Sequence, residues 1–200
     1  MPAPFEILAS PITLWLAPVG TAFPLVTVAP PVPWVRVGTN GDASYDEDGL
    51  VVSHVQKIET ARAAGTTGPI KAFRTEEEFM ISLKLMDISL EQYATAMNGA
   101  TVTTTAAAAA VPGVKRMNLM RGINVITYAL IARGFISAYG DNFVGQYEVP
   151  RVFQSDNPKP VYKKGKPVTL DIEFTALEDV SAPTVLERFG RLTSQHQVPL

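Results

Sequence analysis

Two stretches of this chain alternate between apolar and polar residues, and this pattern constrains the fold more than any other feature. In residues 73–87 the odd positions are mostly apolar and the even positions mostly polar, although Met80 and Met86 interrupt the polar set. Residues 168–176 show the same alternation without interruption. A period of two is typical of a β-strand with one buried and one polar face. The sequence therefore predicts two amphipathic strands.

A short helix is expected after the first of these strands, over residues 89–98. Ser89 can cap its start, and Gln92, three residues later, completes a capping box. An apolar stripe at helical spacing is formed by Leu90, Tyr93, Ala94 and Met97. Asn98 and Gly99 end the helix, because glycine readily adopts the left-handed backbone found there.

Other segments of the central region also indicate strands. These are residues 35–37, 50–60, 114–120, 123–133 and 147–153. Residues 123–133 are apolar on both faces, so both faces must be covered. Pro150 indicates an edge strand or a bulge, because proline lacks a backbone donor. Residues 100–112 are a low-complexity run that predicts a long connecting loop, and residues 45–49 and 159–166 predict an acidic turn and a solvated lysine-rich loop.

The first 35 residues predict an extended arm. They contain eight of the 16 prolines and both tryptophans. Prolines at this density argue against a helix or a central strand, yet the segment is too apolar for a disordered linker. The arm packs either on its own domain or on a neighbouring subunit. In the second case its interface anchors are aromatic side chains: Trp15, Trp34 and Phe23, with Phe189 in the C-terminal segment.

Together these elements predict one mainly β domain. The expected architecture is an antiparallel β-sandwich or barrel with one short helix, a long loop and two extended arms. The sandwich or barrel itself covers residues 36–179. Residues 1–35 form the first arm, and residues 180–200 form a second arm with one helix.

Composition and motifs exclude several function classes. The net charge of −2 provides no basic footprint for nucleic-acid binding, and the chain has no cysteine for a disulfide or a thiolate metal site. His54 and His196 are the only histidines, and neither belongs to a metal-ligand or catalytic motif. The first basic residue is Arg36 and no apolar run is long enough to span a membrane, so neither a secretory signal nor a membrane segment is expected. We expect no catalytic residues, no metal and no cofactor.

Two parts of the sequence resemble the major tail tube protein of long-tailed bacteriophages. The first reads TTGPIKAFRTEEE followed by DISLEQYATAMNG, and the second reads YEVPRVFQSDNPKP followed by KGKPVTLDIEFTALED. The resemblance covers roughly residues 36–179. It implies a non-enzymatic virion protein whose six copies form a ring, with their sheets combined into one barrel around a channel.

The same resemblance implies partners and a location. The rings would stack into a tail tube that surrounds a tape-measure protein and later conducts DNA without binding it specifically. Tail terminator and tail-tip proteins would meet its ends, and assembly would take place in the bacterial cytoplasm. The ring-forming tube of a contractile secretion system is an alternative, and a small-ligand-binding β-barrel is an alternative from a different class.

The polar sides of the two amphipathic strands are the candidate channel lining. This set comprises Glu76, Glu78, Ser82, Lys84, Thr169, Asp171, Glu173 and Thr175. Carboxylates along a channel repel phosphates, so DNA would slide past them. Ordinary solvent exposure of an antiparallel sheet is the other interpretation of the same pattern.

Overall fold

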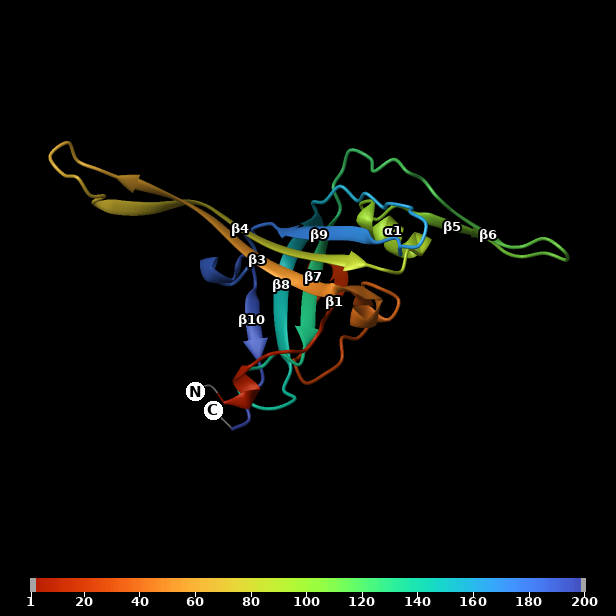
Figure 1. Ribbon diagram of the computed structural model, residues 1–200, viewed down its shortest axis with the longest axis horizontal. Coiled ribbons are helices and arrows are strands. Elements are labelled where there is room, and N and C mark those ends of the chain that lie inside the picture. The colour runs from red at the N-terminus through yellow and green to blue at the C-terminus, as the bar shows by residue number, and fades with distance from the viewer. Residues whose placement is uncertain (1–2, 199–200) are drawn as a thin grey trace.

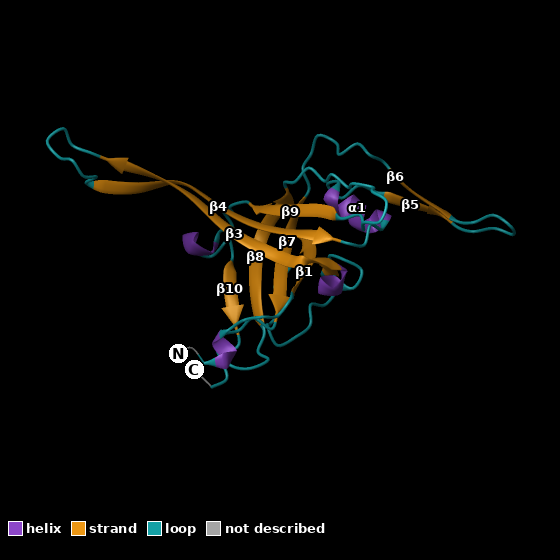
Figure 2. Ribbon diagram, viewed as in Figure 1, coloured by secondary structure: helices purple, strands orange, loops and turns teal. Residues whose placement is uncertain are grey.

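The structure is a computed structural model that describes residues 3–198 (Figures 1 and 2). It is mainly β, with 41% strand and 9% helix, which confirms the predicted fold class. The strands and the single α-helix of the described residues are β1 (Ile12–Pro18), β2 (Val35–Arg36), β3 (Tyr45–Ala61), β4 (Lys71–Leu85), α1 (Leu90–Ala96), β5 (Val102–Thr105), β6 (Val114–Met117), β7 (Thr127–Gly134), β8 (Gly145–Gln154), β9 (Leu170–Ala176) and β10 (Arg191–Ser194). Short 3-10 turns lie at Pro4–Glu6, Gly41–Ser44 and Val185–Glu187.

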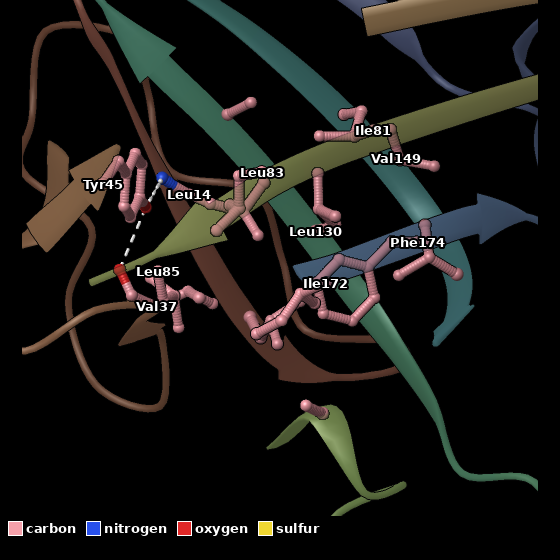
Figure 3. Close-up of a cluster of buried hydrophobic side chains, with 14 of the residues drawn as sticks. Leu14, Val37, Tyr45, Ile81, Leu83, Leu85, Leu130, Val149, Ile172 and Phe174 are labelled. Atoms are coloured by element: carbon pink, nitrogen blue, oxygen red, sulfur yellow. Dashed lines mark hydrogen bonds between the residues drawn. The ribbon is translucent and has the colours of Figure 1, made fainter. Parts of the chain in front are cut away.

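One antiparallel sheet contains most of these strands, in the order β2-β1-β7-β8-β9-β4-β3, and β10 pairs with β8. In Figure 2, β3, β4 and β9 cross β1, β7 and β8 at a steep angle, so the sheet folds over itself into two layers. The main core lies between these layers, with side chains from both (Figure 3). Leu14 and Leu130 come from one layer, whereas Leu83, Ile172 and Phe174 come from the other.

The alternation in the two amphipathic strands is confirmed where they cover this core. Every second residue is buried along residues 79–85 of β4 and along β9. The first part of β4, residues 71–78, is exposed throughout, and Phe73 there is 45% exposed. This part of β4 leaves the body as a two-stranded hairpin with β3, so the expected apolar side at Phe73 is not buried.

Both faces of β7 are covered, as expected. Leu130 and Ala132 belong to the main core, whereas Ala129 and Ile131 on the other face pack in a second cluster with Trp34. The strand begins later than predicted. Ile123 and the next three residues precede it, and Ile123 is 98% exposed.

Pro150 lies at a bulge, which was one of the two structures predicted for it. Tyr128 pairs with Val152 and Leu130 pairs with Val149, so two residues of β8 face a single residue of β7. On its other edge, β8 pairs with β10 before Pro150 and with β9 after it. The missing donor of the proline therefore falls where the partner strand changes.

The prediction that residues 1–35 form an extended arm is wrong for residues 12–18, because these form β1, a strand of the sheet. It pairs with β7 from Ile12 to Pro18, and its outer neighbour β2 reaches it at only two positions. Prolines did not exclude a strand here because Pro11 and Pro18 stand at its ends rather than inside it. The Tyr45 hydroxyl further ties β1 to the body (Figure 3): it donates to the Val37 carbonyl at 2.9 Å and accepts from the Leu14 amide at 3.0 Å.

The C-terminal segment also belongs to the body rather than to a second arm. Its strand β10 pairs with β8, with Leu192 opposite Tyr147. Phe189 packs against the main core. The expected helix is only the 3-10 turn Val185–Glu187.

The helix α1 begins and ends as the sequence predicts, within two residues. The Ser89 hydroxyl accepts a hydrogen bond from the Gln92 amide at 3.3 Å. The Gln92 side chain does not return this bond, because it accepts from the Gly38 amide at 3.0 Å and so joins the helix to the segment after β2. Asn98 and Gly99 both have positive φ, at 61° and 68°, and end the helix.

The prediction of a long loop over residues 100–112 is wrong for its first half. Residues 102–105 form β5 and pair with β6 as a second two-stranded hairpin. The threonines and Val102 favour a strand because they are β-branched, and the alanine run forms the hairpin tip. In Figure 1 the β3–β4 and β5–β6 hairpins extend from opposite ends of the molecule.

Candidate functional site

The polar sides of β4 and β9 lie next to each other on the outer side of one layer. The strands are antiparallel neighbours, with Ser82 opposite Glu173 and Lys84 opposite Asp171. Thr175 lies opposite Met80 in the same ladder. The structure therefore brings five of the eight predicted channel residues onto one surface, which we call the polar face: Ser82, Lys84, Asp171, Glu173 and Thr175.

The other three predicted residues lie elsewhere. Glu76 and Glu78 are on the exposed β3–β4 hairpin, beyond the region where β9 pairs with β4. Glu76 forms an ion pair with Lys57 across the hairpin, at 2.9 Å. Thr169 precedes β9 and is outside the ladder.

Carboxylates dominate the polar face. The Lys84 ammonium forms an ion pair with Asp48 at 3.0 Å, and this hydrogen bond raises the pKa of Lys84, with the charges of Asp48, Asp171 and Asp46 adding to the effect. Asp48, Asp156, Asp171 and Glu173 line a shallow hollow of about 490 Å³ that contains only this one lysine. The face is therefore negative.

Glu173 also has a structural contact. The Ser155 hydroxyl donates to the Glu173 carboxylate at 3.0 Å and accepts from the Thr175 hydroxyl at 2.8 Å. These bonds hold the start of the loop between β8 and β9 against the polar face. Asp171 forms no ion pair among the described residues, so it is the more available carboxylate.

Sequence reasoning missed Asp48 and Asp156. Asp48 lies in the segment predicted as an acidic turn, and Asp156 in the loop after β8, where no periodicity shows which way a side chain points. Only the acidic run at residues 46–48 was a usable signal. Its position beside Lys84 depends on an irregular pairing between β3 and β4, with a register shift between Tyr45 and Leu50.

Both histidines lie against aromatic rings. His54 packs edge-on against Phe79, with ring centroids 4.7 Å apart, and His196 lies beside Tyr139 at 5.2 Å. Within residues 3–198, no three His, Cys, Asp or Glu side chains are grouped as metal ligands.

The predicted interface anchors make contacts within their own chain, and their role between subunits stays a prediction. Trp34 is only 5% exposed, donates to the Ala22 carbonyl and packs against Phe23 at a centroid distance of 5.6 Å. Phe189 is likewise packed against its own core. Trp15 is partly exposed but lies under the Arg36 guanidinium, 5.7 Å from the ring. These aromatic side chains hold the first 35 residues and the C-terminal segment to their own subunit.

The exposed apolar side chains lie elsewhere, on the protruding segments. Val55, Ile58 and Phe73 are each about half exposed on the β3–β4 hairpin. Leu119 and Met120, just after the second hairpin, are 71% and 85% exposed. Ile58 pairs with Arg74 and Phe73 pairs with Glu59, so Ile58 and Phe73 lie on opposite faces of the hairpin, and both faces expose an apolar side chain.

Comparisons with known proteins do not assign the chain to a family. A scan against protein-family models found no matching model, and a search of curated proteins found no match. Among residues 3–198, no helix has the length and apolar character that crossing a membrane requires.

Proposed function

We propose that this chain is the tail tube protein of a long-tailed bacteriophage, a structural protein that assembles into stacked hexameric rings around a DNA channel. One observation carries the proposal: a folded two-layer body bears two hairpins that extend from opposite ends, with apolar side chains exposed on and beside them. The sequence resemblance supplies the identity of the assembly. It also supplies the expected partners, namely the tape-measure, terminator and tail-tip proteins, and the virion tail as location.

The hairpins support self-assembly on physical grounds. Every residue from His54 to Glu78 is exposed, so this part of β3 and β4 has no layer packed on either side. An isolated two-stranded hairpin is marginally stable in water. Neighbouring copies that cover Val55 and Phe73 on one face and Ile58 on the other would stabilise the hairpin and remove apolar surface from water.

The polar face supports a channel for DNA. Its carboxylates outnumber its single lysine, and its surface is shallow rather than enclosed. Repeated around a ring, these carboxylates repel phosphates and leave DNA without attachment points. Such a lining serves passage rather than recognition.

Electron microscopy of the purified protein in negative stain tests the assembly. We expect rings or tubes with a stained central channel. A small-ligand-binding protein would give separate particles of one size at every concentration, and this result would contradict the proposal.

Substitution on the polar face tests the channel. Asp171→Lys with Glu173→Lys would place close-set ammonium groups around the axis, so variant tubes should retain DNA at low salt and release it as salt rises. Wild-type tubes and the neutral control, Asp171→Asn with Glu173→Gln, should retain none. Variant tubes that fail to hold DNA at low salt would show that this face is not the lining.

A further inference from the structure

Charge is distributed unevenly along this chain. Residues 98–126 and 155–169 contain seven Lys and Arg but a single acid, Asp156, whereas the remaining residues contain ten Lys and Arg and eighteen acids. The net charge of −2 therefore hides a strongly positive part and a negative remainder. We call the positive part the basic end: Lys115, Arg116, Arg121, Lys159, Lys163, Lys164 and Lys166.

The basic end is held together around α1. The Arg121 guanidinium donates to the Asp156 carbonyl at 3.3 Å, which joins the segment after β6 to the loop between β8 and β9. The Asn98 amide, at the end of α1, donates to the carbonyls of Arg121 and Asn124 at 3.0 and 2.8 Å. Figure 1 shows both segments beside α1 at one end of the molecule.

Most cations of this end are exposed and unpaired. Lys115 forms an ion pair with Glu91 on α1, at 2.5 Å. Arg116 and the four lysines of the β8–β9 loop are exposed, and among residues 3–198 they form no ion pair. Like charges gathered without counter-charges repel one another, so an acidic partner would lower the free energy of this surface.

The same end exposes apolar side chains, and this favours a protein partner over a nucleic acid. Leu119, Met120 and Ile123 flank Arg121 and are 71%, 85% and 98% exposed. A phosphate backbone would neutralise the cations but leave these side chains in water. A protein surface that is both acidic and apolar would cover both.

Such a surface exists on this chain, around the start of β3. We call it the acidic rim: Asp42, Asp46 and Glu47. Met86, which is 46% exposed, adjoins it, because its amide donates to the Ser44 carbonyl at 2.8 Å. Within the described chain Asp42, Asp46 and Glu47 form no ion pair, so their charge remains available to a second molecule.

We propose that the basic end of one copy binds the acidic rim of a second copy. When each copy uses its two surfaces toward two different neighbours, the contact is head to tail and repeats from copy to copy into a ring or filament. This inference rests on the proposed tube function and deepens it by naming the two surfaces of one contact between copies. It does not involve Asp171 or Glu173, which stay free to line a channel.

Charge reversal and mixing test the pairing. Lys163→Glu with Lys164→Glu should weaken self-association about tenfold or more, measured by sedimentation at low salt, because like charges would then face each other. Asp46→Lys with Glu47→Lys should have a similar effect. An equimolar mixture of the two variants should associate again, since each supplies the charge that the other lacks.

Control variants and outcomes separate this inference from the proposed function. Lys163→Arg with Lys164→Arg should associate like the wild type, and circular dichroism should show that the lysine variants, altered only in an exposed loop, are folded. If the wild type forms tubes and the charge-reversed variants associate as strongly as the wild type, the pairing of the basic end with the acidic rim is wrong. The tube function would still stand. Folded variants that each lose association but do not recover in the mixture would overturn it as well.

Two other outcomes also decide against the pairing. Binding of a 20-base-pair DNA duplex that Lys163→Glu with Lys164→Glu abolishes, with association unchanged, would make the basic end a nucleic-acid surface. A wild-type protein that stays monomeric at every concentration would overturn both the pairing and the tube function.

Discussion

The two halves of β4 differ in sequence and in surroundings: residues 79–85 alternate between apolar and other side chains, whereas residues 71–78 carry one large apolar side chain, Phe73. From Phe79 to Leu85 every second side chain is buried, whereas from Lys71 to Glu78 all side chains are exposed. The difference arises from the neighbours. Strand β9 pairs with β4 only from Met80 to Leu85, and the opposite layer of the sheet lies over the same part. Alternation thus predicts a strand, but burial requires a second layer.

The exposed half is held by local contacts alone. It pairs with β3, and ion pairs join Lys57 to Glu76 and Arg74 to Glu77. All four side chains are more than half exposed, so these pairs contribute little to stability. The body should therefore govern folding, and the hairpins should govern assembly.

Deletion of residues 1–35 should have the largest effect, which is loss of the folded state. It removes β1, including Leu14 and Leu16 in the main core, and Trp34 in the second cluster. Several large buried side chains together contribute about as much as the whole stability of a typical domain. Thermal melting by circular dichroism should show no cooperative transition.

A shorter deletion is the matched control for that experiment. Removal of residues 1–10 leaves β1 intact and should preserve a cooperative melt. If the chain lacking residues 1–35 also melts cooperatively, the first segment is an arm after all.

Shortening the β3–β4 hairpin should have the opposite effect. Replacement of residues 58–75 by Asn-Gly closes a two-residue turn after Lys57 and Glu76, which face each other in the register. The body should melt within a few degrees of the wild type, whereas rings and tubes should be absent from micrographs. Normal tubes from this variant would show that the hairpin is dispensable for assembly.

The same substitution, Phe to Ala, made once in the body and once in the hairpin compares the two regions at single residues. Phe174→Ala removes a side chain that is 1% exposed and should lower the free energy of unfolding by about 3–5 kcal/mol. Phe73→Ala in the exposed half of β4 should change it by less than about 0.5 kcal/mol. Urea denaturation of the dissociated protein measures both, and equal losses would contradict the division between body and hairpin.

The smallest effect concerns the link between α1 and the second hairpin. The hydrogen bond from Lys115 holds the pKa of Glu91 below its usual value of 4.5. A depressed carboxyl pKa contributes stability above the unfolded-state pKa, and this contribution is lost as the pH falls through the folded-state pKa. In Lys115→Met the Glu91 pKa measured by NMR should rise, and an unchanged pKa would show that the pair is not formed.

The sequence predicted features that depend on local pattern. The buried sides of residues 79–85 and 170–176, the Ser89 cap and the possibility of a bulge at Pro150 all follow from spacing or from the chemistry of one residue. The strand at residues 12–18 was missed because the density of prolines was read without regard to their positions at its ends.

Features that depend on contacts between distant parts of the chain were harder to predict from the sequence. Phe73 was counted with the buried side of β4, although Thr75 and Glu77 stand between it and Phe79, and the sequence could not show that the opposite layer stops at Phe79. The hairpin at residues 102–117 was hidden because an alanine run has no periodicity. Asp48 and Asp156 join the polar face only through irregular segments, and pairing of Ser82 with Glu173 depends on a register set across the whole sheet.

An electron cryomicroscopy reconstruction of the assembled protein tests the central claim most directly. The account predicts that residues 54–78 and 102–117 are covered by neighbouring copies, and that Asp171 and Glu173 face a central channel. Hairpins that remain free in solvent, or these two carboxylates on the outer wall or within a subunit contact, would contradict it.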